Sequence, residues 1–221
     1  MSQTGTLIEH YDGSAWSVVP APPVAGSLDA VAAIAADDVY AVGYYFSGPR
    51  ILTLAMHYDG TAWSVVPTPN RAYTRNMLAA LEVVSPNDIW AVGYSNGTGG
   101  RHKDRTLIER FDGTKWSIVR SPNVGDGSNE LWAIDAVAAN DIWAVGEFRR
   151  GTLILNYDGT TWTADADTPT FSAAGDSLNA VVALGPNDVW AFGGWVEHQF
   201  GSNPEYRSLI HHFDGTSWQN I

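Results

Sequence analysis

The feature that most constrains this chain is a short pattern that occurs five times: an aromatic residue, Asp, Gly, and a Trp three residues after the Gly. An Asp-Gly pair between two alternating apolar runs is typical of a tight β-hairpin, because Gly accepts positive φ and the Asp side chain can bond the backbone of the turn. Each copy therefore predicts strand, turn, strand. The turn aspartates, to which we assign a structural role, are Asp12, Asp59, Asp112, Asp158 and Asp214.

A second pattern alternates with the first and predicts another hairpin. It reads Asp, an aliphatic residue, an aromatic residue, Ala, an apolar residue and Gly, at 38–43, 88–93, 141–146 and 188–193. A run of small apolar residues precedes each copy, and a turn such as Ser85-Pro86-Asn87-Asp88 separates the two. Pro pre-sets φ in such a turn, and Asn and Asp tolerate its remaining positions. One repeat is thus four strands, a, b, c and d.

The spacing of the Asp-Gly pairs, 46 to 56 residues, indicates the architecture. Four short strands per unit at such a period are typical of propeller blades, which bury their faces against each other. We predict an all-β fold, a β-propeller of four-stranded antiparallel blades in one domain, 1–221. It has four complete repeats after an N-terminal half repeat, or about five blade positions. The half repeat is 1–20, and the blades lie near 28–66, 77–119, 130–164 and 178–221.

The half repeat leaves three arrangements open, because a lone hairpin is marginal in water. The ring could contain one two-stranded blade, the chain could be a segment of a longer array, or a second copy could complete it by self-association. We favour a ring of about five positions that is cut from, or completed by, something larger.

These motifs resemble the kelch repeat of galactose-oxidase-like propellers, and the Asp-Gly-Thr-x-Trp turns look like the Asp-box of sialidase-type propellers. The double Gly typical of kelch repeats is present only at Gly193-Gly194. The resemblance covers nearly the whole chain and implies the fold. It implies no single activity, because such propellers serve as protein-binding platforms, carbohydrate-binding domains and enzymes.

Composition excludes several classes of protein. A net charge of −12 argues against a general nucleic-acid binder, whose phosphate contacts need clustered Lys and Arg. Without cysteine there are no disulfides or thiolate metal sites. No apolar run is long enough for a membrane-spanning helix and no signal-peptide pattern opens the chain, so the compartment is left unassigned. We expect no cofactor.

Function is expected where the repeats differ, in the b–c and d–a loops that share one end of the blades. Ten of the twelve Lys and Arg residues fall there, together with aromatic residues that suit sugars or peptides. We predict a non-catalytic module that binds a glycan or a protein through these loops. The candidate ligand-binding residues are Arg75, Arg101, Arg105, Arg149, Trp195, Tyr206 and Arg207.

Two alternatives belong to other classes. One is a glycan-processing enzyme, of hydrolase or lyase type, with acids such as Glu197 or Glu205 on the loop side; the other is a structural repeat scaffold. Equivalent sites in every blade would favour a multivalent lectin, whereas one singular cluster of dissimilar residues would favour an enzyme. His10, His57 and His212 occupy the same place in strand c, one per blade, so we predict no shared metal.

Overall fold

The computed structural model describes residues 5–72, 74–96, 103–149, 151–165, 175–197 and 205–221, and these form β-strands without any helix. Arg101 lies outside the described residues. The strands are β1 (Glu9–Tyr11), β2 (Trp16–Val18), β3 (Gly26–Ala35), β4 (Asp38–Ser47), β5 (Arg50–Tyr58), β6 (Trp63–Val66), β7 (Arg75–Ser85), β8 (Asp88–Asn96), β9 (Asp104–Phe111), β10 (Trp116–Val119), β11 (Asn129–Ala138), β12 (Asp141–Phe148), β13 (Gly151–Tyr157), β14 (Trp162–Ala164), β15 (Ser177–Gly185), β16 (Asp188–Glu197), β17 (Glu205–Phe213) and β18 (Trp218–Asn220).

Each predicted repeat is one run of four consecutive antiparallel strands. We call β3–β6 blade 1, β7–β10 blade 2, β11–β14 blade 3 and β15–β18 blade 4; β1 and β2 form a separate hairpin. One parallel bridge, between Ile51 and Arg75, links blades 1 and 2. Because consecutive strands are antiparallel, the a–b and c–d turns lie at one end of every blade, the turn end. The b–c and d–a connections lie at the other, the loop end.

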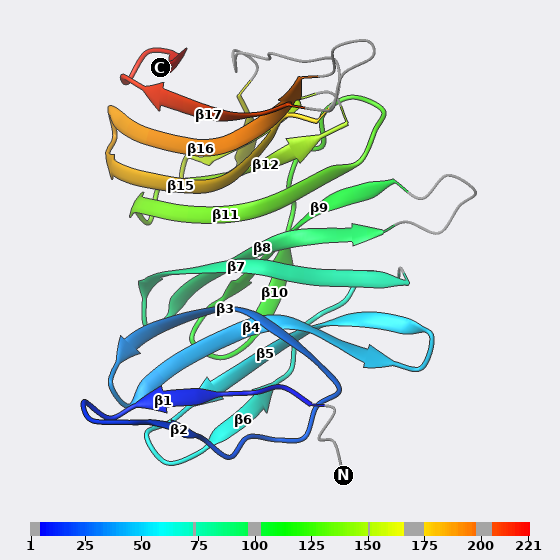
Figure 1. Ribbon diagram of the computed structural model, residues 1–221, viewed down its shortest axis with the longest axis vertical. Helices are drawn as coiled ribbons and strands as arrows, with labels where there is room; N and C mark the ends of the chain where they lie inside the picture. The colour runs from blue at the N-terminus through cyan, green and yellow to red at the C-terminus, as the bar shows by residue number, and fades with distance from the viewer. Residues whose placement is uncertain (1–4, 73, 97–102, 150, 166–174, 198–204) are drawn as a thin grey trace.

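The blades follow one another along the longest axis of the molecule, with the hairpin and blade 1 at the bottom of the view and blade 4 at the top (Figure 1). The first strand of each blade packs beside the first strand of the next, as β3 does with β7, β7 with β11 and β11 with β15. The all-β, four-stranded organisation agrees with the prediction. The predicted ring is not observed, because the two terminal sheets stand at opposite ends of the molecule and do not pair with each other.

The Asp-Gly turns have the expected chemistry. The Gly residues of the five turns adopt φ between 85° and 98°. In the turn at Asp158, the carboxylate accepts the N–H groups of Thr160 and Thr161 at 2.8 and 2.7 Å. The same two bonds recur in the other four turns. The pKa of every turn aspartate is lowered, at Asp12 and Asp112 first by the hydroxyl of Ser14 or Thr114 and then by these N–H groups, and at the other three first by the N–H groups.

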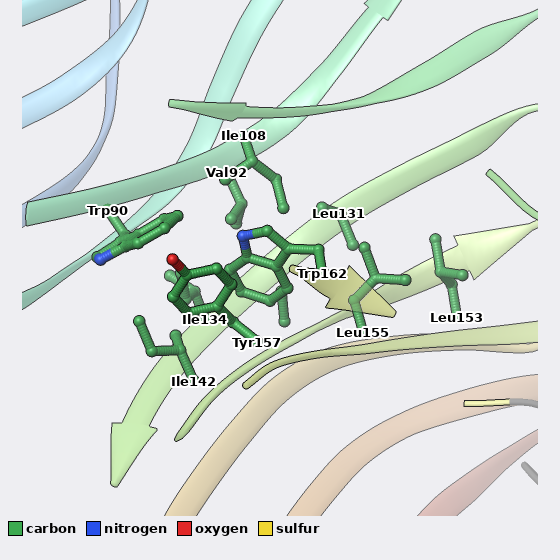
Figure 2. Packing of buried hydrophobic residues seen from close by; sticks show 11 residues of the cluster. Trp90, Val92, Ile108, Leu131, Ile134, Ile142, Leu153, Leu155, Tyr157 and Trp162 are labelled. Carbon is green, nitrogen blue, oxygen red and sulfur yellow. The ribbon is translucent and has the colours of Figure 1, made fainter. Parts of the chain in front are cut away.

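Aromatic residues hold neighbouring blades together. Trp90 of β8 is fully buried and lies 4.8 Å from Tyr157 and 5.7 Å from Trp162, ring centre to ring centre, both from the turn hairpin of blade 3 (Figure 2). Trp143 of blade 3 packs in the same way on the hairpin of blade 4, and Tyr40 of blade 1 on that of blade 2. Removing one such buried ring typically costs about 3–5 kcal/mol of stability.

Candidate active site

Two glutamates face each other at the loop end of blade 3. Glu130 lies near the start of β11 and Glu147 near the end of β12, and the two are directly paired in the antiparallel register. Directly opposed residues project to the same face of a sheet, with Cβ atoms about 4.5–5.5 Å apart. Both side chains are partly buried. The pairing therefore places two carboxyl groups side by side.

A third acid comes from blade 2. Asp104, at the start of β9, accepts a hydrogen bond from Asn96 Nδ2 at 2.9 Å, and its own N–H donates to Ser128 Oγ at 3.1 Å. Its carboxyl group also acts on Glu130, since it raises the pKa of that side chain. Neighbouring carboxyl groups disfavour each other's ionisation, so one of them tends to keep its proton.

The surroundings favour Glu130 as the carrier of that proton. Burial is the main reason that its pKa rises to about 7, and the neighbouring carboxyl groups of Asp104 and Glu147 add to the effect. The charge of Arg75 acts in the opposite direction. Burial also raises the pKa of Glu147, and the Ser177 side chain acts in the opposite direction. The site thus holds a carboxylic acid that titrates near neutral pH beside a second carboxyl group.

A pocket of about 180 Å³ opens onto both glutamates. Its walls are Ser128, Glu130, Glu147, Phe148, Arg149, Gly175 and Asp176. This volume is below the roughly 300–1,000 Å³ usual for drug-sized ligands, so the pocket suits a small polar group.

An aromatic pair lies beside the acids. Tyr94 of β8 and Trp132 of β11 meet edge to face with 5.5 Å between ring centres, and the Arg75 guanidinium lies 5.0 Å from the Tyr94 ring centre. Burial is the first reason that the pKa of Tyr94 rises to about 12. The arrangement combines an apolar surface, a cation and carboxyl groups.

Hydrogen bonds from buried polar residues position this end of the molecule. Asn129, directly before Glu130, is fully buried; its Oδ1 accepts the N–H of Val124 at 2.7 Å and its Nδ2 donates to the Gly127 carbonyl at 3.2 Å. In blade 2, Thr106 donates its N–H to Asn123 Oδ1 at 3.1 Å. These bonds tie the 120–128 connection to the strands that carry the acids, as a rigid site requires.

The predicted ligand-binding residues divide between two places. Arg149 lines the pocket, Arg75 acts on Glu130, and Arg105 follows Asp104 in β9. By contrast, Trp195, Tyr206 and Arg207 lie on β16 and β17 of blade 4, where Trp195 pairs with Arg207 and Tyr206 is 81% exposed. Their role as ligand contacts stays a prediction. Glu197 and Glu205 pair in the backbone register of the same two strands, and their side chains lie outside the described residues.

Sequence reasoning missed the two glutamates, although a signal was present. Glu147 follows the Gly that ends the second motif, where the other copies have Tyr44, Tyr94 and Gly194. Glu130 stands where the other repeats have Ser or Met. The two acids thus belong to one repeat alone, and the strand register, which pairs them, was the missing information.

The remaining chemistry of the described residues gives no metal site. They contain no group of three or more His, Asp or Glu side chains placed to hold a metal ion. His57 and His212 instead approach Asp38 and Asp188, with Nε2–Oδ1 distances of 2.7 and 2.9 Å. Over the same residues, no helix is long and apolar enough to cross a membrane.

Comparison with known proteins finds similarity in structure only. No known protein-family profile and no curated protein matches the chain. A protein from Parabacteroides distasonis assigned as a glycoside hydrolase superposes with a TM-score of 0.51 at 10% identity, over 90% of this chain and 73% of that one. The fold is of the β-propeller type.

Two further structures are similar at lower scores. One concerns the GH130 family of mannoside phosphorylases, described as containing glycoside hydrolases that target β-1,2-mannosidic linkages in Candida mannan (TM-score 0.48, 12% identity, 90% of this chain and 71% of that one). The other is YCF48 bound to D1 peptide (TM-score 0.49, 11% identity, 94% and 71%).

These comparisons correct two predictions. The structure that superposes with a TM-score of 0.51 is assigned as a glycoside hydrolase, so the kelch-like relationship is not supported. The same structure contradicts the prediction of a non-catalytic binding module. At this level of identity the likeness itself establishes the fold alone.

Proposed function

We propose that the chain is a glycan-processing enzyme of hydrolase type, with its active site at the loop end of blades 2 and 3. One observation carries the proposal: Glu130, with a pKa of about 7 that Asp104 helps to raise, directly opposes Glu147 at a small pocket. Cleavage of a glycosidic bond commonly uses two carboxyl groups, one as acid and one as base or nucleophile.

In this proposal Glu130 is the general acid. A general acid is most effective when its pKa lies near the working pH, since it is then still protonated and gives up its proton readily. The Glu130 proton passes to the glycosidic oxygen as the bond from that oxygen to the anomeric carbon breaks. Asp104 helps to keep Glu130 protonated, since its carboxyl group raises the pKa of Glu130.

Glu147 takes the complementary role of the nucleophile, because directly opposed carboxyl groups fit the short separation of retaining enzymes and leave no room for a water between them. Its carboxylate attacks the anomeric carbon as the leaving-group bond breaks. Water then hydrolyses the resulting glycosyl ester and gives its proton to Glu130, so that the proton donated in the first step is recovered. The negative charges around the pocket also stabilise the positive charge that develops on the sugar ring. The partly buried ring of Trp132, which rests edge to face on the buried Tyr94, supplies an apolar surface for the face of a sugar.

The test is a hydrolysis screen of the full chain on aryl glycosides, with mannosides and arabinosides among them. On a cleaved substrate, Glu130→Gln should lower kcat by about 10²–10⁴-fold, the usual contribution of acid–base catalysis. Glu147→Gln should lower kcat by at least as much, because the covalent intermediate can then no longer form. Activity of the unchanged protein should fall above about pH 7, where Glu130 loses its proton.

Glu82→Gln is the matched control. Burial and the charge of Asp135 raise the pKa of Glu82 to about 7 as well, but Glu82 pairs with Trp90, near the turn end of β7. This variant should keep full activity, and circular dichroism should show all three variants folded. Full activity in folded Glu130→Gln, or no hydrolysis of any glycoside by the folded parent, would overturn the proposal.

A further inference from the structure

In every complete blade, the second and third strands make the same polar contact. The Asp that opens the second strand contacts a polar side chain of the third strand. In the antiparallel register, this polar residue is paired with the aromatic residue that stands two positions after the Asp. The four contacts are Asp38 with His57 at 2.7 Å, Asp88 with Arg110 at 2.6 Å, Asp141 with Asn156 at 3.1 Å and Asp188 with His212 at 2.9 Å.

The aromatic residue also contacts the same polar side chain in three of the blades. Tyr40 stacks on His57 with 4.3 Å between ring centres, and Trp190 stacks on His212 with 4.1 Å. In blade 2 the Arg110 guanidinium lies 5.0 Å from the ring centre of Trp90. The Asp and the aromatic residue of the second strand therefore both contact one polar side chain of the third strand.

The β1–β2 hairpin has the third-strand residue of this contact. His10, directly before Tyr11 of the turn motif, stands where His57 and His212 stand before Tyr58 and Phe213. Among the described residues, β1 pairs with β2 alone. All residues of both strands are exposed, and Trp16 is 69% exposed where its counterpart Trp116 is 4% exposed.

A cavity of about 640 Å³ adjoins β1. Leu7 and Ile8 of the hairpin segment line one side, and Val31, Tyr58 and Trp63 of blade 1 line another. At the three interfaces between blades, the aromatic ring of the preceding second strand packs on the aromatic pair of the following turn hairpin. Tyr58 and Trp63 are the corresponding aromatic pair of blade 1. The cavity lies beside them, where the aromatic ring of a preceding second strand would pack.

We propose that β1 and this face of blade 1 form an acceptor site for a β-hairpin with the first-half pattern of the repeat, such as 26–47. Its second strand pairs with β1, its Asp bonds His10, and its aromatic residue stacks on His10 and fills the cavity against Tyr58 and Trp63. Addition of a strand to an open edge provides main-chain hydrogen bonds, and the side-chain pocket provides selectivity.

The occupant is a hairpin additional to those of this chain. The four hairpins of this pattern within the described residues are each paired with a third strand of their own blade. A second copy of the chain therefore brings no unpaired hairpin. The site goes beyond the proposed hydrolase activity and lies on another part of the molecule.

The experiment is a graft onto the full chain. A copy of residues 26–49 is joined directly to Gln3; aligning Thr6 with Thr53 places Gln3 at the position of Arg50, so the natural spacing is kept. We expect the melting temperature to rise by about 5 °C or more, and amide exchange of residues 8–11 to slow about tenfold or more.

The matched control is the same graft with Asp38→Ala and Tyr40→Ala in the copied segment, and a second control is His10→Ala in the unaltered graft. Both should lose most of the protection of β1. Equal exchange in the parent and the graft would overturn the proposal. Protection of β1 in the parent that rises with protein concentration, together with dimers in sedimentation, would assign the site to a second copy and overturn it as well.

Discussion

At the scale of single residues, the interior contains an acid outside the candidate active site. Glu109 of β9 is fully buried, at a position where the other complete blades have Met56, Leu155 and His211. Burial raises its pKa to about 8, although the Thr53 hydroxyl and the charge of Arg71 act in the opposite direction. The side chain is therefore mostly uncharged at neutral pH, which is the form that a protein interior tolerates.

This pKa makes the stability of the protein depend on pH. The folded state holds the Glu109 proton up to about pH 8, whereas the unfolded chain releases it near pH 4.5. The stabilisation is complete below pH 4.5 and is lost as pH rises toward 8, with a slope of up to about 1.4 kcal/mol per pH unit for one such group. Glu109→Gln should flatten this slope in urea unfolding curves recorded between pH 5 and 8.

Glu9→Gln is the control for that measurement. Glu9 occupies the corresponding position of the exposed hairpin, and its replacement should leave the pH dependence unchanged. If Glu109→Gln and the parent lost stability in parallel between pH 5 and 8, another group would be responsible.

At the scale of strands, sterics explain why the second motif ends in Gly. In each blade it faces the first strand where the register shifts by one residue, as Gly93 does opposite Leu78. A Cβ on Gly93 would lie 2.1 Å from the Met77 carbonyl oxygen, and the corresponding distances at Gly43, Gly146 and Gly193 are 2.2, 2.0 and 1.8 Å. The strands approach too closely there for any side chain.

Gly93→Ala should therefore destabilise blade 2 by about 1–3 kcal/mol or more, the usual effect of overpacking, because backbone atoms must move. Gly185→Ala is the matched control, since a Cβ at Gly185 meets nothing within 4 Å, and it should remain within about 0.5 kcal/mol of the parent. Urea unfolding measures both. Equal stabilities would show that β7 and β8 can separate at little cost.

The strands also show what could be predicted from sequence. The hairpins follow from local signals, because Asp158-Gly159 and its equivalents contain the whole chemistry of a turn. The pair of Glu130 and Glu147 depends on which residues of β11 and β12 stand opposite each other, and a bulge between Leu131 and Ala133 alters that register. Asp104 reaches the pair from another blade. Local patterns carry neither kind of information.

At the scale of the whole molecule, each blade relies on its neighbours. Blades 2 and 3 are covered on both faces, whereas the terminal sheets leave apolar side chains uncovered: Trp16 and Val31 at one end, Leu184 and Phe192 at the other, between 38% and 69% exposed. In repeat proteins, stability is approximately a sum of units and of contacts between nearest neighbours. Opening of the structure is thus expected to begin at the ends.

Two deletions followed by amide exchange test whether each blade depends on its nearest neighbours. Removing 175–221 uncovers Trp143, Val145 and Ile154 of blade 3, which pack against blade 4. Exchange in blade 3 should then accelerate strongly, while exchange in blade 1 stays unchanged. Removing 1–24 takes away a fully exposed hairpin, and exchange in β8 and β12 should remain within about threefold of the parent, since their contacts are intact. If either deletion accelerated exchange equally in all blades, the sheets would unfold as one cooperative unit, and nearest-neighbour contacts would not describe the stability of this protein.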